Sequence, residues 1–266
     1  RSKTEKMNLF KKAIFFTDIH FGLKSNSRTH NQDCLDFVDF VIKTGKEQNC
    51  ETCVFLGDWH NNRASLQIGT LNYSVQAIDK LSAAFDQIIF IPGNHDEHYR
   101  DTREMNSVVW AKKYENVRLF DEITTVDDVC ITPWLVGDEH KQIKKVEAKY
   151  MFGHFELPSF YMNAMVQMPD VGDLRRDDLK CETVFTGHFH KRQTSKNITY
   201  IGNAFPHNYA DVGDDDRGCM VLDWGKDPVY IPWPDAPKYR KFRLSEILED
   251  TDRLLLSNMY CRVEID

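Results

Sequence analysis

Five short motifs combine carboxylate, imidazole and carboxamide side chains, and each directly follows an apolar run of strand length. In chain order the motifs are Asp18-Ile19-His20, Gly57-Asp58, Gly93-Asn94-His95-Asp96, Gly153-His154 and Gly187-His188-Phe189-His190. Alone, any one of them would indicate a turn or a polar surface segment. Ligand sites in α/β proteins form beyond the carboxyl ends of strands. Together, the five motifs therefore predict one common site.

The side chains of these motifs suit a pair of divalent metal ions. Carboxylate, imidazole and carboxamide ligands favour manganese, iron or zinc over magnesium alone. No cysteine belongs to the set, which argues against a structural zinc site. A glycine precedes Asp58, Asn94, His154 and His188. Glycine lets the chain turn sharply, so the backbone at these positions is able to approach an ion closely.

The elements that position these motifs begin in the order β-α-β-α-β. Residues 13–17, 53–56 and 88–91 are predicted to be buried strands, separated by helices around 35–42 and 71–85. This order predicts parallel strands with crossover helices. Later segments are richer in strands, and the candidates are 117–120, 129–132, 149–152, 183–185, 199–201 and 219–222. We therefore expect an α/β fold with two packed sheets and helices outside them.

Composition narrows the class of protein. The chain of 266 residues has a net charge of −7, from 34 basic and 41 acidic residues. Proteins that bind nucleic acid mainly through phosphates are usually basic, so this balance argues against strong autonomous DNA binding but leaves local basic patches open. Seven scattered cysteines, an odd number, predict a reducing compartment. No stretch approaches the roughly 20 apolar residues of a membrane helix, and we expect a cytoplasmic protein.

In this order the motifs D-x-H, G-D, G-N-H-D, G-H and G-H-x-H resemble those of the calcineurin-like metallophosphoesterase superfamily. The resemblance implies a four-layer α-β-β-α sandwich, in which two mixed sheets are flanked by helices. It also implies that Asp18, His20 and His190 hold a first metal ion, that Asn94, His154 and His188 hold a second, and that Asp58 bridges them. A bridging hydroxide would attack phosphorus, and His95, oriented by Asp96, would assist the leaving group.

One block departs from the superfamily pattern. It reads Gly57-Asp58-Trp59-His60-Asn61-Asn62-Arg63, with Asn61 where the superfamily commonly has a further acidic residue or histidine. His60 lies one position earlier. Two interpretations of His60 stay open: a second catalytic histidine, or an outward-facing loop residue. The bridging role implied for Asp58 is the same in both.

Segments beyond the metal motifs resemble the nuclease branch, which includes SbcD-type, meiotic-recombination-eleven-type and tailed-phage recombination endonuclease subunits. They are GNHDEHY at 93–99, ITPWL at 131–135, GHFEL at 153–157 and YIGN at 200–203. The resemblance implies manganese-dependent exonuclease action on duplex DNA ends and endonuclease action on single strands, in recombination and double-strand-break repair. Magnesium, iron or zinc are alternatives for the two ions. A homodimer, an SMC-like coiled-coil ATPase partner and, for a phage protein, the host-cell cytoplasm are also implied.

Four basic residues flank the motifs and are candidates for DNA contacts: Arg63, Arg100, Lys191 and Arg192. Taken singly, each is better explained as an ordinary solvated charge. We expect an N-terminal extension over 1–12 and a nuclease domain over 13–232. The Pro-rich stretch 228–237 predicts a linker, and residues 233–266 would hold that linker and the start of a capping module.

Two other functions stay compatible with the motifs. The same metal chemistry would serve a phosphomonoesterase or a cyclic-nucleotide phosphodiesterase, which hydrolysis of small phosphoesters would reveal. A function of another class is a non-catalytic scaffold with the same fold. Such scaffolds usually lose metal ligands, whereas this chain has all seven together with His95 and Asp96.

Overall fold

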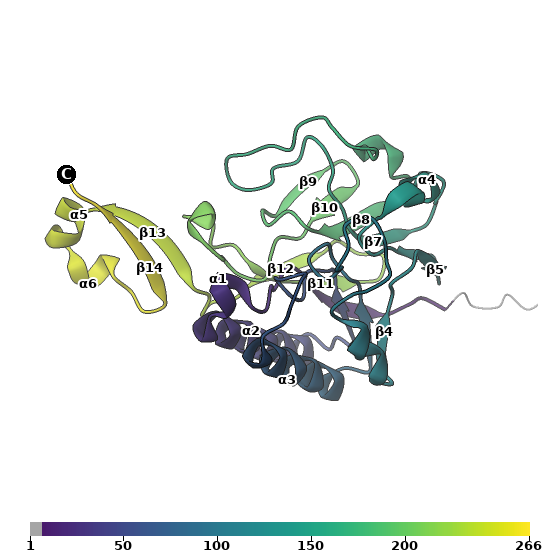
Figure 1. The fold of residues 1–266 in the computed structure, drawn as a ribbon, viewed down its shortest axis with the longest axis horizontal. Helices are drawn as coiled ribbons and strands as arrows, with labels where there is room; N and C mark the ends of the chain where they lie inside the picture. Colours follow the sequence, from purple (N-terminus) through teal and green to yellow (C-terminus); the bar gives the residue numbers. More distant parts are fainter. Residues whose placement is uncertain (1–6) are drawn as a thin grey trace, which may run out of the picture.

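Two six-stranded sheets pack face to face in the computed structural model, which describes residues 7–266 (Figure 1). The first sheet has the order β12 (Val229–Pro232), β11 (Gly218–Asp223), β1 (Lys12–Phe16), β2 (Thr52–Phe55), β3 (Gln87–Phe90) and β4 (Val117–Leu119). The second has the order β5 (Thr124–Val126), β6 (Val129–Ile131), β7 (Tyr150–His154), β8 (Thr183–Gly187), β10 (Ile198–Tyr200) and β9 (Gln193–Ser195). Both sheets are mixed. In the first sheet β11 runs antiparallel to its neighbours β1 and β12, and in the second the edge strands β5 and β9 run antiparallel to the parallel centre.

The central strands are parallel and buried on both faces, as their continuous apolar sequences predicted. Their inward side chains form the core between the sheets, where the ring centroids of Phe15 and Phe152 are 5.0 Å apart. Val54 and Ile89 extend the same layer along the first sheet. This core holds the carboxyl ends of β1, β2, β3, β7 and β8 beside one another.

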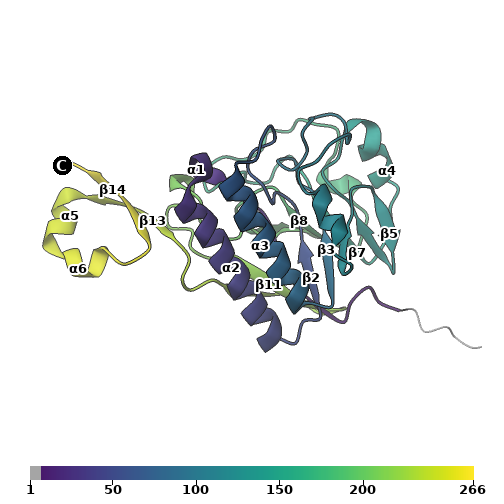
Figure 2. The same ribbon diagram turned by 60° about the horizontal axis from the view of Figure 1, so that its bottom comes forward.

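Helices α2 (Arg28–Glu47) and α3 (Ile68–Ala84) are the predicted crossovers and lie side by side over the first sheet (Figure 2). The second sheet is covered mainly by irregular chain between β7 and β8, with Leu157, Phe160 and Leu174 in the core, and by the short helix α4 (His140–Ile143). The outer layers of the sandwich are therefore unequal, and only one consists of long helices. No helix of the described chain is long and apolar enough to cross a membrane.

Two predicted boundaries differ from the structure. Leu9 and Phe10, assigned to an extension over 1–12, are buried in the core between the sheets, and residues 1–6 lie outside the described residues. The stretch predicted as a linker contains the edge strand β12, where proline is tolerated because one side of an edge strand makes no ladder hydrogen bonds. Trp233 also packs against Phe37 of α2, with ring centroids 5.5 Å apart. The sandwich therefore begins before residue 12 and continues past residue 232.

The C-terminal segment forms a small module that projects from the sandwich (Figure 1). Strands β13 (Lys238–Arg243) and β14 (Met259–Glu264) pair in parallel, and α5 (Leu244–Glu249) and α6 (Thr251–Leu254) connect them. Tyr239 stacks on Tyr260 at an interplanar angle of 9°. The Tyr239 hydroxyl also donates a 2.8 Å hydrogen bond to the carbonyl of His207, which attaches the module to the sandwich.

Candidate metal centre

The loops that carry the five motifs meet at one edge of the two sheets. The Asp18 amide donates to the Gly57 carbonyl at 2.9 Å, and the His20 amide donates to the Asp58 carbonyl at 3.1 Å. Gly57 has a φ of +101°, and a Cβ atom there would overlap the His154 ring. A Cβ at Gly93 would overlap the backbone of Asp58. Glycine is therefore required at both positions, because the loops approach one another too closely for a side chain.

Several of the predicted ligand residues have strained backbones. Asp18, His20, Asp58 and His188 have φ values of 52°, 54°, 62° and 94°, in the left-handed region that L-residues rarely adopt. Such strain costs about 1–3 kcal/mol per residue and tends to gather at functional sites. Here the left-handed backbone turns these four side chains, which come from three loops, into one shared space.

The structure brings the side chains predicted for the first ion around a common point. The Asp18 Oδ1 atom lies 3.7 Å from His20 Nε2 and 3.7 Å from His190 Nε2, and His20 Nε2 lies 3.6 Å from Asp58 Oδ2. Ligand atoms about 2.1 Å from one ion are about 3.0–3.5 Å apart at right or tetrahedral angles. Asp18 Oδ1 and both His20 nitrogens are buried with no hydrogen-bond partner in the described chain. An ion would satisfy Asp18 Oδ1 and the lone pair of one His20 nitrogen.

The side chains predicted for the second ion lie on the other side of Asp58. Asp58 Oδ2 is 3.4 Å from His154 Nε2, and Asn94 Oδ1 is 3.0 Å from both His154 Nε2 and His188 Nδ1. The other His154 nitrogen, Nδ1, lies 2.7 Å from the Leu56 carbonyl oxygen and donates to it. Because Nδ1 carries the proton, the lone pair of Nε2 faces the shared space. Backbone carbonyls orient metal-binding histidines in the same way.

The ionisation of these groups is strongly perturbed. Burial alone would raise the pKa of Asp18, but the charge of His154 and the contact with His20 outweigh it and lower the pKa to about 2. Burial opposes the charged form of His154, yet Asp58 and Asp18 overcome this and raise its pKa to about 9. The buried carboxylates therefore attract a cation, and in the metal-free chain a proton on His154 takes that role.

His95 lines a cavity of about 170 Å³ together with four of the candidate ligands, His20, Asp58, His188 and His190. Its Nδ1 lies 2.7 Å from the carbonyl oxygen of Asn61 and donates to it, so Nε2 is the nitrogen free to meet a substrate. Its ring is 4.9 Å from the His20 ring. Burial lowers the pKa of His95 despite the nearby charge of Asp58, which makes a proton on this ring easy to release.

The expected role of Asp96 is wrong, because its carboxylate does not orient His95. It accepts hydrogen bonds from four backbone amides instead: Gly93, Asp58, Trp59 and His60, at 2.8–3.2 Å. Asp96 therefore ties the loop after β2 to the loop after β3. The Asn61 carbonyl orients His95, so the unusual block 57–63 contributes through its backbone.

Both interpretations of His60 are wrong. Its side chain is completely buried and does not line the cavity. Nδ1 lies 2.8 Å from the Ser107 hydroxyl, and Nε2 lies 2.8 Å from the Ser74 hydroxyl on α3. With both nitrogens occupied, His60 is a satisfied core histidine.

A profile of the calcineurin-like phosphoesterase family matches residues 11–192, which is more than half of the chain. This chain belongs to the calcineurin-like phosphoesterase family. Membership confirms the resemblance inferred from the motifs, the α/β sandwich and the class of metal-dependent hydrolase. The divalent-metal requirement of the family agrees with the His and Asp clusters of the cavity.

The phosphoesterase is also similar to individual proteins. It is 29% identical over 222 residues to "Exonuclease subunit 1" of Enterobacteria phage T4, covering 80% of this chain and 64% of that relative. The crystal structure of Pseudomonas putida nuclease MPE aligns with a TM-score of 0.35 and 16% identity, covering 67% of this chain and 61% of that one. Yfce, a phosphoesterase from E. coli, aligns with a TM-score of 0.42 and 14% identity, covering 85% and 94%. Both TM-scores are below 0.5, so these two structures add nothing to the assignment.

The four basic residues predicted to contact DNA differ in how exposed and how paired their charged groups are. Arg63 is half-buried, its Nη1 atom has no partner in the described chain, and burial lowers the pKa of its guanidinium. Arg100 is exposed, and the Lys191 ammonium lies 5.0 Å above the Tyr161 ring. Arg192 is paired with Asp216 and its guanidinium lies 4.2 Å above the Tyr230 ring, so it is less available to DNA than Arg100.

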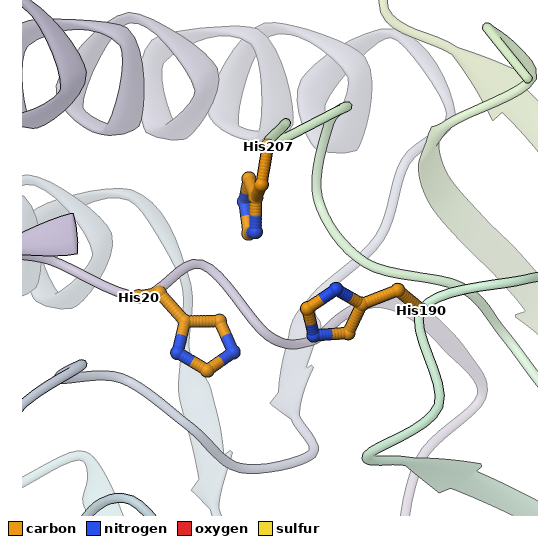
Figure 3. A group of neighbouring side chains, drawn as sticks. All are labelled: His20, His190 and His207. Atoms are coloured by element: carbon orange, nitrogen blue, oxygen red, sulfur yellow. The ribbon is translucent and has the colours of Figure 1, made fainter. Parts of the chain in front are cut away.

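The motifs did not identify one histidine that lines the cavity, His207. It follows β10 by several residues, belongs to none of the five motifs, and is only 1% exposed. Its ring lies beside those of His20 and His190, with centroids 5.5 and 5.4 Å away (Figure 3). The centroid of the His30 ring is also 5.4 Å away. The sequence Phe205-Pro206-His207-Asn208 carries no signal that distinguishes this histidine from a surface one.

Proposed function

We propose that this phosphoesterase is a two-metal phosphodiesterase that cuts DNA, with exonuclease action on duplex ends and endonuclease action on single strands. The observation that carries the two-metal proposal is the position of Asp58, whose carboxylate lies between the first set of candidate ligands and the second. Asp18, His20 and His190 would hold the first ion, and Asn94, His154 and His188 the second. Manganese is proposed for both, with magnesium, iron or zinc as alternatives.

When bound, two such ions supply a water of lowered pKa and compensate the charge of the phosphate. The chain contributes the remaining chemistry. The Nδ1–H of His95 is held by the Asn61 carbonyl, so in the protonated, imidazolium form its Nε2–H is free to pass a proton to the leaving oxygen and return the ring to the neutral form. A general acid of this kind accelerates a reaction by about 10²–10⁴-fold. Asp96 maintains the geometry by holding the two loops that bear Asp58 and His95.

A polymeric substrate is supported by the surroundings of the cavity. The charge of half-buried Arg63 interacts with that of Asp58, which places this guanidinium near the candidate metal ligands, and guanidinium groups recognise phosphates well. Exposed Arg100 and part-buried Lys191 would meet the flanking backbone of DNA. The similarity to the phage exonuclease subunit points the same way.

The wider setting follows from the nuclease resemblance. We propose action in recombination and double-strand-break repair, as a homodimer with an SMC-like coiled-coil ATPase, in the cytoplasm of a host cell. The relative is named as a subunit, which supports a multi-subunit assembly. The β13–β14 module, attached through Tyr239, is proposed as part of a DNA-capping module.

Hydrolysis assays with manganese test the proposal. Linear duplex DNA, single-stranded DNA and small phosphomonoesters and cyclic nucleotides are compared for the full chain. We expect cleavage of both DNA forms, a loss of about 10²–10⁴-fold in turnover for His95→Ala with both ions still bound, and no loss for His140→Ala, which removes an imidazole from α4. Cleavage of small phosphoesters alone would refute the nuclease proposal in favour of a phosphomonoesterase or cyclic-nucleotide phosphodiesterase. No ion binding and no hydrolysis would indicate a scaffold.

A further inference from the structure

We propose that His207 is a third imidazole ligand of the first metal ion, alongside His20 and His190, and that this site consequently selects a borderline transition metal over magnesium. The inference rests on the proposed two-metal function of the cavity. It adds a ligand that lies outside the five sequence motifs and comes from the segment between β10 and β11.

The three imidazoles surround one space (Figure 3). One nitrogen of each ring lies within 4.8 Å of a nitrogen of the other two. Ligand atoms of a single ion are about 3.0–4.2 Å apart, so rotation of the rings toward one another would bring all three onto one ion. His20 comes from the loop after β1 and His190 from the loop after β8, so His207 supplies a third direction.

The ring of His207 lacks any other partner. It is 1% exposed, and neither Nδ1 nor Nε2 has a hydrogen-bond partner within the described residues. A neutral imidazole carries one N–H donor and one lone pair, and burial of both without partners is unfavourable. A bound cation would use the lone pair, and a water or substrate oxygen beside it would accept from the N–H.

The backbone of His207 is held from two sides. Its amide donates to Asp211 Oδ2 at 2.8 Å, and its carbonyl accepts from the Tyr239 hydroxyl at 2.8 Å. The Phe205 ring packs against it with centroids 5.0 Å apart. A histidine held this firmly is preorganised for an ion, because little freedom is lost on binding.

The added imidazole changes the chemistry of the first site. With Asp18 and the bridging Asp58, three imidazoles make a nitrogen-rich ligand set. Imidazole suits zinc, iron, copper and nickel, whereas magnesium prefers carboxylate, carbonyl and water oxygens. The second site, with two imidazoles and an amide oxygen, is less biased.

Titration calorimetry of the metal-free full chain with zinc chloride tests the inference. We expect the unmodified chain to bind two ions. In His207→Ala the affinity of one of the two sites for zinc should fall by at least about tenfold, since losing a residue that only hydrogen-bonds a metal ligand already costs that much. Competition with magnesium should also become more effective in that variant. The matched control is His60→Asn, which removes a buried imidazole that lies outside the cavity.

The outcomes distinguish failure of the His207 assignment from failure of the proposed two-metal function. Equal affinity of His207→Ala and the unmodified chain for both ions would overturn the role of His207 and leave the two-metal function intact. A chain that binds no pair of ions would overturn the proposed function itself, and the inference with it. Loss of one site in both His207→Ala and His60→Asn would mean a general packing effect, and would also overturn the role of His207.

Circular dichroism and thermal unfolding establish whether His207→Ala folds. If it does not, a zinc-soaked crystal of the unmodified chain decides the question. We expect a His207 nitrogen about 2.0–2.1 Å from an ion that His20 and His190 also bind. A His207 ring whose nitrogens both stay beyond about 3 Å from zinc would overturn the assignment, since zinc–nitrogen bonds are much shorter.

Discussion

Replacing Gly57 by alanine should disrupt both stability and metal binding, because two separate costs coincide at this residue. Its φ of +101° is a conformation that L-residues rarely adopt, and an added Cβ would overlap His154 and lie 2.9 Å from the Gly93 Cα. Backbone strain costs about 1–3 kcal/mol and overpacking costs about 1–3 kcal/mol. Alanine recovers about 0.4–1 kcal/mol by restricting the unfolded chain. The net loss in the free energy of unfolding is about 1–6 kcal/mol.

Urea unfolding in chelator, followed by tryptophan fluorescence, measures this loss as a lower midpoint at unchanged slope. Gly69→Ala is the matched control, since Gly69 lies in α3 with nothing within 4 Å of an added Cβ. The same chemical change should stabilise there by about 0.5–1 kcal/mol, because alanine is the better helix former. A loss below about 1 kcal/mol for Gly57→Ala would refute the close approach of Gly57 to His154.

Three other perturbations follow from the same geometry. Arg63→Gln should weaken DNA binding in fluorescence anisotropy, and Arg192→Gln should have the smaller effect, because the Arg192 guanidinium is already paired with Asp216 and stacked on Tyr230. Tyr239→Phe removes the hydrogen bond to the His207 carbonyl, worth about 0.5–1.5 kcal/mol, and should lower the melting temperature slightly with the fold retained. Because the folded-state pKa of His154 is raised from 6.5 to about 9, its protonation stabilises the metal-free chain fully below pH 6.5. That stability should be lost as pH rises through about 9 in urea titrations, and a flat profile would contradict it.

Much of the fold was predictable from local pattern. The strands β1, β2 and β3 were recognised as continuous apolar runs, because a parallel strand in the centre of a sandwich is buried on both faces. The edge strands β5, β9 and β12 were missed, since each is only three or four residues long and partly exposed. Strand β13 was also missed, because its charged sequence KYRKFR is not apolar.

The positions of the candidate ligands could also be predicted from the sequence, but the directions of nearby side chains could not. Asp58 and His60 belong to one loop, yet Asp58 faces the cavity while His60 turns toward Ser74 on α3. That difference depends on the left-handed backbone at Asp58 and on where α3 packs. Neither is visible in the order of residues.

By itself, the sequence determined the class of chemistry and the edge of the sheets where it gathers, because both depend on residue types directly after apolar strands. Tertiary structure alone decided which side chains complete the site. His207 reaches the cavity only because the chain after β10 returns across it. Asp211, four residues further on, holds the amide of His207, and Tyr239 of β13 holds its carbonyl. Asp96 likewise became a structural tie between loops, since its acceptors are satisfied by amides brought together by folding.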